Sequence, residues 1–376
     1  MSLPVTKTLP SMVICWLRSN LFRNPFDAAL SILLIAAIIS GMYQLLQWGM
    51  LNSVWAASSF DECTAIVAQT HGVGTQGACW APLLAHWDVI MFGFYPTGEV
   101  WRPVMAFCLF PLALLPVMFR AIPRIFLIFS ATYPVLAFYL IWGGAGLTVV
   151  PSSRLSGVLL TMVVAVAGSM VAVSLGVVLA IGRCYAIMPL SAVCTSVTFF
   201  FRSIPVIVVL FAGTVLRSYA LPAGTWVDPI LWVSLLIAMP TSALIATELH
   251  SALRNLPTAQ KDAARALGLT EAKVFFLVTF PQAYRSRSPA IVGALAGLFR
   301  NTTLMIVFGQ LDLLQITLMI PKEAEWRGST SEIVVSLVLL YWVFGFAFSR
   351  YSQFLSAKRA AERTIADHAQ FTVPLR

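Results

Sequence analysis

The chain has 376 residues, of which 59% are hydrophobic and only 10% are charged. Its mean hydropathy of +0.86 excludes a soluble globular domain and indicates an integral membrane protein. Lys and Arg outnumber Asp and Glu by 24 to 15, but they lie between apolar runs and not in one basic domain. This argues against nucleic acid as a partner and favours a signal of membrane topology.

Apolar runs long enough to cross a membrane occur along the whole chain. A helix needs about 20 apolar residues to span a hydrocarbon core about 30 Å thick. About eight runs come close to this length, at 28–50, 103–119, 125–142, 157–181, 204–220, 230–247, 288–309 and 332–349. The sequence therefore predicts an all-α integral membrane protein with about eight transmembrane helices.

The first run follows Lys7, Arg18 and Arg23, is too long for a signal peptide and lacks a clear cleavage site. We expect it to stay as an anchor with the N-terminus inside. Alternation from there makes every inside segment basic and places the C-terminus inside as well. The inside segments then hold Arg120, Arg124, Arg183, Arg202, Arg254, Lys261, Arg265, Lys273, Arg285, Arg287, Arg350, Lys358, Arg359 and Arg363.

One apolar stretch is interrupted by Arg202 and Pro205. Because a charge at the bilayer centre is unfavourable, Arg202 should mark the inner interface. We expect residues 189–202 to lie along the membrane surface before the chain turns in.

The predicted spans divide the chain into two parts and a tail. An N-terminal module, 1–150, has three spans and a long outside loop, 51–101. The second part, 151–357, has five spans and a long inside loop, 248–287, and residues 358–376 form an inside tail.

The outside loop contains Cys63 and Cys79, the only two cysteines expected on the outer side. In an oxidising periplasm they would form a disulfide, and the alternative is two unpaired small residues. The segment GVGTQG, 72–77, matches a dinucleotide fingerprint without its strand and helix, so we interpret it as a turn. No metal site is expected, because these polar residues lack ligand spacing: Asp61, Glu62, His71, His86 and Asp88.

The inside loop has the pattern of two short helices. Apolar residues at 259, 263, 266 and 267 share one face of the first, and Gly268 should end it in the left-handed region. Thr270 should cap the second, which would run to Pro281. Such a compact protrusion suits a cleft on a partner protein.

These residues also carry a family resemblance. The spacing of Asp262-Ala263-Ala264, Gly268 and Val278-Thr279-Phe280-Pro281 resembles the EAA loop of permease subunits in bacterial ABC importers. FFFRSIPVIVVLF and FRNTTLMIVFGQLDLL resemble two further segments of that family, the second one in polar amino-acid permeases. The resemblance covers about 155–357, and the extension resembles larger permeases of general L-amino-acid transporters. Asp262 replaces the motif's Glu, and Asn301 replaces a common acidic residue.

The resemblance implies a MetI-like five-helix core behind a three-helix extension, in a bacterial inner membrane with both termini cytoplasmic. It implies that residues 256–270 dock on an ATPase subunit, and that Asp262, Ala263, Ala264, Gly268 and Pro281 couple ATP hydrolysis to alternating access. ATP and Mg²⁺ would bind that partner, because the sequence has no Gly-Lys pair and so no P-loop. The other implied partners are a second permease, expected to be a paralogue, a periplasmic binding protein, membrane lipid and an L-amino-acid substrate.

Polar residues interrupt the apolar run at 288–309, and polar side chains at membrane depth usually face a cavity or the protein interior. We therefore consider Arg300, Asn301, Thr302, Thr303, Thr241 and Glu248 candidates for the substrate pathway. Arg300 would meet a substrate carboxylate; alternatively, it pairs with a backbone carbonyl or with Glu248 to hold the bundle. Glu248 alternatively marks the membrane interface, and we interpret the Gly293/Gly297 pair as helix packing.

Other classes of membrane protein have signals that this sequence lacks. A channel would show a filter or a charged ring, and an ion-coupled secondary transporter would show inverted repeats and buried carboxylates. A membrane-embedded enzyme would show a catalytic cluster such as H-E-x-x-H. We therefore expect a transporter subunit that is not itself an enzyme.

Overall fold

The computed structural model describes residues 21–118, 123, 125–220 and 227–371. Within these ranges the chain is helical, and the remaining backbone pairing consists of isolated bridges. The predictions that concern Lys7, Arg18, Arg120, Arg124 and residues 372–376 lie outside the described residues. The chain divides into two compact units, which are described separately: residues 1–85 with 321–332, and residues 86–320 with 333–376.

Unit 1 begins with the apolar helix α2, Pro25–Leu46, which continues as a π-helical segment, Gln47–Leu51. Helix α3, Phe60–His71, starts at Ser59, whose side chain accepts a hydrogen bond from the Glu62 amide, and α4, Ala81–Ala85, ends the unit's first part. The Phe60 amide donates to the Glu325 carbonyl, so residues 321–332 return to this unit. Helix α3, and not a strand, precedes the 72–77 turn.

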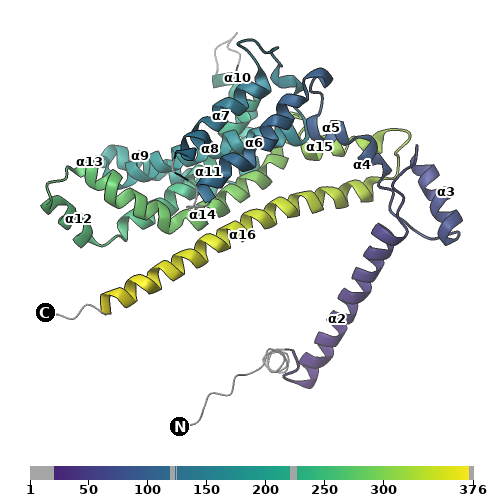
Figure 1. The fold of residues 1–376 in the computed structure, drawn as a ribbon, viewed down its shortest axis with the longest axis horizontal. Helices are drawn as coiled ribbons and strands as arrows, with labels where there is room; N and C mark the ends of the chain where they lie inside the picture. The colour runs from purple at the N-terminus through teal and green to yellow at the C-terminus, as the bar shows by residue number, and fades with distance from the viewer. Residues whose placement is uncertain (1–20, 119–122, 124, 221–226, 372–376) are drawn as a thin grey trace. The chain divides into compact units, whose positions relative to one another are not determined.

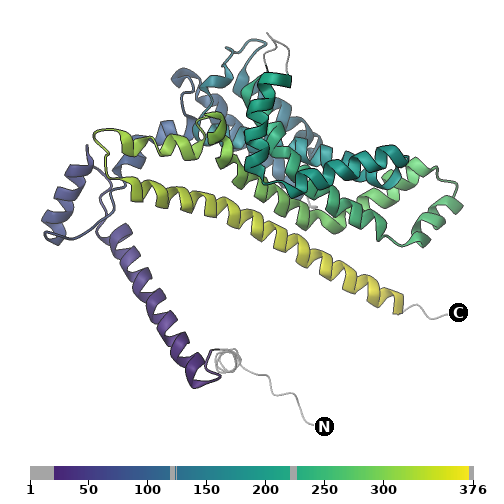
Figure 2. The same ribbon diagram turned by 180° about the vertical axis from the view of Figure 1, so that it is seen from behind.

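Unit 2 contains the other helices, which Figures 1 and 2 show from two sides. At one end of the unit lie α12 and α13, and at the other lie α5 and α15. In chain order they are α5 (Trp87–Phe92), α6 (Trp101–Met118), α7 (Phe126–Trp142), α8 (Gly157–Tyr185), α9 (Met188–Ser203), α10 (Val206–Ala220), α11 (Pro229–Arg254), α12 (Thr258–Ala266), α13 (Glu271–Lys273), α14 (Phe280–Asn301), α15 (Leu313–Thr317) and α16 (Thr330–Phe371, which starts in unit 1).

The core of unit 2 is the close packing of α8 on α11. Small residues recur every fourth position along one face of α8, and all of them are buried: Gly168, Ala172, Gly176 and Ala180. A Cβ at Gly176 would lie 2.7 Å from Cγ2 of Ile245 on α11. Only a small residue lets two membrane helices approach this closely.

The predicted spans correspond to α2, α6, α7, α8, α10, α11, α14 and α16. In the described part of the chain, six helices are long and apolar enough to cross a membrane, or seven if the bent pair α9 and α10 forms one span. Helix α7 is shorter, at 17 residues. The all-α fold is confirmed, and the count of eight is approximate.

Helices α9 and α10 meet at a bend of 110° beside Pro205. Residues 189–202, predicted to leave the direction of the spans, form most of α9. Proline disfavours a helical conformation in the residue before it, and Ile204 is extended.

The two compact units do not divide at residue 150, where the sequence predicts a boundary. Helices α6 and α7 belong to unit 2 with the five later spans. One reason is visible at the end of α7, where Trp142 donates through Nε1 to Oγ of Ser152, at 3.2 Å, across the predicted boundary.

Candidate functional site

The inside loop is a helix, a glycine turn and a second helix. Helix α12 ends where the Gly268 amide donates to the Arg265 carbonyl at 2.8 Å and the Leu269 amide donates to the Ala264 carbonyl at 3.3 Å. Gly268 has a φ of +79°, so this is a Schellman turn with glycine in the left-handed region. This is the turn that the sequence predicts.

The second helix does not stop at Pro281. The chain stays helical from Glu271 through a π-helical segment, Val274–Thr279, into α14, where Pro281 is one of the first residues. Proline is tolerated in a first turn, and the wider π turn next to it relieves the clash that proline causes inside a regular helix. The expectation that Pro281 ends a separate helix is therefore wrong.

A cluster of charges closes the loop. Arg265 donates through Nε and Nη2 to the two carboxylate oxygens of Glu271, at 2.7 and 3.1 Å, and through Nη1 to Oδ1 of Asp262, at 3.0 Å. The hydrogen bond to Glu271 is the main reason that the pKa of Arg265 is raised. All three side chains are exposed, so each pair contributes little to stability, and the Arg265–Glu271 pair links α12 to α13.

The pairing of Arg265 with Glu271 was not predicted from the sequence. The sequence feature that could have indicated this pairing is two opposite charges, Arg265 and Glu271, on either side of the Gly268 turn. Asp262, the first residue of the motif, forms its ion pair within its own helix, with Arg265.

The apolar face of α12 is open. Ala259, Ala263, Ala266 and Leu267 are exposed, and Leu267 is 82% exposed, whereas Ala264 is buried where α12 packs against the rest of the loop. The loop itself is anchored to the bundle, because the Phe275 ring meets the edge of Tyr185 at the end of α8, with ring centroids 5.3 Å apart. An anchored loop with an open apolar face has the form of a docking element.

The four polar residues at the end of α14 do not form one cluster. Helix α14 ends at Asn301, and a 3-10 helix follows at Thr302–Phe308. Thr302 is buried and donates to the Phe299 carbonyl at 2.7 Å, while Thr303 donates to the Arg300 carbonyl at 2.9 Å. The Arg300 side chain is exposed and has no hydrogen bond or ion pair with any described residue.

Glu248 has a different partner from the one that the sequence analysis considered. Its Oε2 lies 3.3 Å from Nη1 of Arg287 on α14, and Arg287 also donates to Ser251, at 3.4 Å. The alternative in which Arg300 pairs with Glu248 is therefore wrong, because Arg287, 13 residues earlier on α14, holds that carboxylate. Thr241 is buried, and its nearest hydrogen-bond partner is the Ile237 carbonyl of its own helix, at 3.5 Å.

The Gly293/Gly297 pair does not pack against another helix within the described chain. A Cβ at either position would meet no atom within 4 Å. Arg300 follows on the same face, since it lies seven residues after Gly293. Among the residues that the structure describes, nothing covers α14 at these two glycines.

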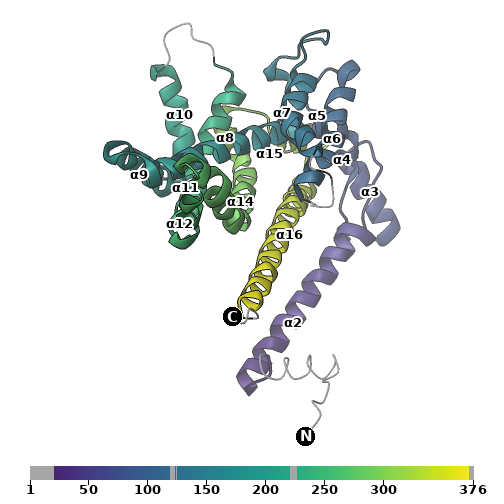
Figure 3. The same cartoon turned by 60° about the vertical axis from the view of Figure 1, so that its left-hand side comes forward.

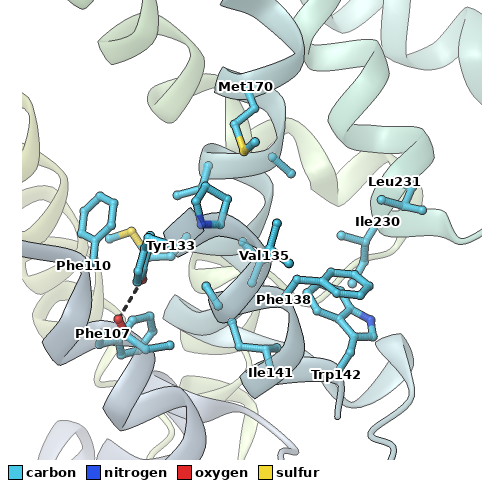
Figure 4. A pocket seen from close by; sticks show the side chains of 17 residues that line it. Phe107, Phe110, Tyr133, Val135, Phe138, Ile141, Trp142, Met170, Ile230 and Leu231 are labelled. Carbon is cyan, nitrogen blue, oxygen red and sulfur yellow. Dashed lines mark hydrogen bonds between the residues drawn. The ribbon is translucent and has the colours of Figure 1, made fainter. Parts of the chain in front are cut away.

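A groove of about 350 Å³ lies between α6, α7, α8 and the start of α11 (Figure 4). Phe110, Val135, Phe138 and Met170 are among its lining residues, and the Tyr133 hydroxyl at its side donates to the Ala106 carbonyl, at 2.8 Å. No charged side chain lines it, so it offers nothing to pair with a charged substrate.

In unit 1, a disulfide joins Cys63 of α3 to Cys79, with Cα atoms 5.9 Å apart. The described residues contain no group of three side chains placed to hold a metal ion. The rings of Trp48 and Trp55 pack against Trp80, next to the disulfide.

Comparisons with known proteins agree with this arrangement. The family model "Binding-protein-dependent transport system inner membrane component" matches residues 173–360. The chain is 32% identical to the glutamate/glutamine/aspartate/asparagine transport system permease protein BztC of Rhodobacter capsulatus, over 92% of this chain and 93% of that protein. It is 30% identical to the inner membrane amino-acid ABC transporter permease protein YhdY of Escherichia coli, over 94% and 95% of the two chains.

A solved structure of an amino acid ABC transporter with histidines has 22% identity and a TM-score of 0.46, over 54% of this chain and 92% of that one. The family match begins within α8 and includes the inside loop, the open face of α14 and most of α16. The chain therefore belongs to the family of inner membrane components of binding-protein-dependent transport systems.

Proposed function

We propose that this chain is a permease subunit of an ATP-binding-cassette importer that moves L-amino acids across the bacterial inner membrane by alternating access. Two full-length relatives named as amino-acid permeases support the substrate class. One observation carries the mechanism: α12 and α13 form a clasped protrusion whose apolar face is exposed and whose base is anchored to α8.

Energy enters from a partner in this proposal. The sequence has no Gly-Lys pair and hence no P-loop, so ATP and Mg²⁺ belong to an ATPase subunit, which we expect to be a dimer. Closure of that dimer would move α12, and the Tyr185–Phe275 contact would pass the movement to α8.

The inside loop carries Lys261, Arg265 and Lys273, and this excess of basic residues favours a cytoplasmic location for it and for both termini. A periplasmic binding protein would then deliver substrate at the opposite end of unit 2. The open face of α14, with Gly293, Gly297 and Arg300, would complete the pathway together with a second permease, expected to be a paralogue. There Arg300 would meet the substrate carboxylate.

The test is Gly268→Val in the assembled complex. A side chain at a φ of +79° strains the backbone by about 1 kcal/mol or more and would re-aim α13. We expect normal membrane insertion, weaker ATPase docking and loss of binding-protein-stimulated ATPase activity and uptake in liposomes. Gel filtration checks complex assembly.

Gly74→Val is the matched control, because Gly74 has a φ of +92° and equally open surroundings in the outside loop. It carries the same backbone strain away from the proposed coupling element. Full stimulation and uptake in Gly268→Val would show that the inside loop is a passive connector. An ion-coupled transporter or a channel would in addition co-purify without an ATPase subunit.

A further inference from the structure

Arg183, in the last turn of α8, has an unusual environment. Its Nε and Nη1 atoms are buried and have no hydrogen-bond partner among the described residues. Its guanidinium lies over the Phe199 ring of α9, 6.0 Å from the ring centroid. Buried donors are almost always satisfied, and a cation lacking both a carboxylate and a hydrogen bond indicates a missing anion or other acceptor.

The groups around Arg183 are cationic or neutral. Arg202 of α9 is close enough to repel it. On the other side, Sγ of Cys184 lies 3.2 Å from Nδ1 of His250. The charges of Arg254 and Lys261 are close enough to interact electrostatically with the Cys184 thiol. The cluster therefore joins the end of α8, the end of α11, helix α9 and helix α12, which lie at the same end of unit 2 (Figure 3).

The nearby carboxylates are already paired. Glu271 interacts electrostatically with Tyr185, the residue two positions after Arg183. Both carboxylate oxygens of Glu271, however, accept hydrogen bonds from Arg265. Glu248 is held by Arg287. No carboxylate of the described chain neutralises Arg183.

Helix α9 shows what kind of surface adjoins this cluster. It exposes several large apolar side chains, and Arg202 stands three residues after Phe199, on the same flank of the helix. The bend of 110° turns α9 away from the direction of α10. The exposed apolar residues of α9 are Met188, Leu190, Val193, Phe199 and Phe200.

We propose that this corner binds the phosphate group of an anionic phospholipid, with Arg183 as the buried contact and Arg202 at the rim. The exposed apolar side chains of α9 lie among the acyl chains, as in an interfacial helix, and Arg202 of α9 and Arg183 of α8 reach the headgroup level beside Phe199. Under the orientation proposed above, this is the cytoplasmic leaflet, whose anionic lipids attract basic residues near the membrane surface.

A phospholipid fits better than a free anion or a protein carboxylate. The cations gather beside an exposed apolar helix, and only a lipid supplies a phosphate and hydrocarbon together. The transported amino acid is a poor candidate for this site. Its ammonium group would meet the cations of the cluster and no free carboxylate. This inference needs a membrane protein but not transport, so it can fail or hold independently of the proposed function.

The experiment uses the assembled complex in detergent and counts bound lipid by native mass spectrometry. Phosphatidylglycerol and phosphatidylcholine with identical acyl chains are added in parallel. We expect preferential retention of phosphatidylglycerol by the unmodified complex. Arg183→Met should lower that retention by about fivefold, the effect of one basic residue near the membrane surface.

Arg154→Met is the matched control, since Arg154 is an exposed arginine just before the opposite end of α8. Its retention of phosphatidylglycerol should equal that of the unmodified complex. Arg202→Met should give an intermediate loss, because Arg202 stands at the rim.

Three results would overturn the proposal. Equal retention of the two lipids by the unmodified complex would do so without any variant, even if Arg183→Met failed to fold. Displacement of phosphatidylglycerol by excess inorganic phosphate would indicate a site for free anions. Release of the ATPase subunit from Arg183→Met with lipid retention unchanged would indicate a protein contact.

Discussion

Two glycine-containing stripes behave oppositely in this chain. On α8, Gly168 and Gly176 are buried, and a Cβ at Gly176 would collide with Ile245. On α14, Gly293 and Gly297 face open space. Both stripes have a small residue at every fourth position. This pattern indicates a close helix–helix contact, but it does not say whether the second helix belongs to the same chain.

A similar contrast separates two arginines. Arg102 is 1% exposed and bonds to Glu99 and Thr148, whereas Arg300 is exposed and unpaired among the described residues. Buried and paired groups hold unit 2 together. Open and unpaired groups mark the faces where we expect partners, so the two kinds should fail differently when they are substituted.

Gly176→Val should have the largest effect. The added atoms would meet Ile245 and the Ser242 carbonyl, and overpacking of this kind costs about 1–3 kcal/mol or more. We expect little folded permease, measured as the monodisperse fraction in size-exclusion chromatography. Gly293→Val should yield folded permease but impair assembly of the transport complex, and equal yields from the two variants would break the contrast.

Arg102→Met should destabilise unit 2 by about 3 kcal/mol, because the Thr148 carbonyl loses its donor and Glu99 loses its cation and keeps only the Thr148 hydroxyl. Thermal unfolding of the purified subunit measures this change. Arg300→Met should leave the unfolding temperature unchanged and reduce uptake. Unmodified uptake in a well-assembled Arg300→Met complex would remove Arg300 from the pathway.

Asp312 allows a smaller, pH-dependent test of burial. Its Oδ1 caps α15 by accepting from the Gln315 amide at 3.0 Å, it is fully buried, and burial raises its pKa to about 6. Between pH 6 and about 3.8, Asp312 is protonated in the folded state and ionised in the unfolded state. Protonation of Asp312 therefore makes the protein more stable as the pH falls through that window.

Asp312→Asn keeps a good capping residue and removes the buried charge. At pH 7 the variant should be the more stable by up to about 3 kcal/mol, and the difference should shrink as pH falls to 5. A constant difference across that range in thermal unfolding would show that Asp312 does not titrate there.

The disulfide should have the smallest effect on unit 2, because Cys63 and Cys79 both belong to unit 1. Closing a loop of this length stabilises a domain by about 3 kcal/mol, and that gain should stay within unit 1. We expect neither thiol to react with maleimide in periplasm-matured protein until a reductant is added. Labelling of both thiols without reductant would contradict the pairing.

Much of the fold was predictable from sequence because its signals are local. Hydropathy determined where α2, α8, α11 and α16 run, and Pro205 indicated the bend before α10. Gly268 predicted its own left-handed turn, since that conformation depends on one residue's lack of a Cβ. The motif from Asp262 to Pro281 likewise located the protrusion.

Tertiary structure alone decided which distant groups meet. The sequence places Arg287 and Arg300 on one helix but does not say that Glu248 takes the first. The sequence shows two stripes of small residues, but it does not show that the stripe on α8 is covered and the one on α14 is open. It also does not show that α6 and α7 belong to the same compact unit as the later spans. Hydropathy and turn preference are properties of a few neighbouring residues, whereas pairing and packing depend on how helices far apart in the chain are rotated against one another.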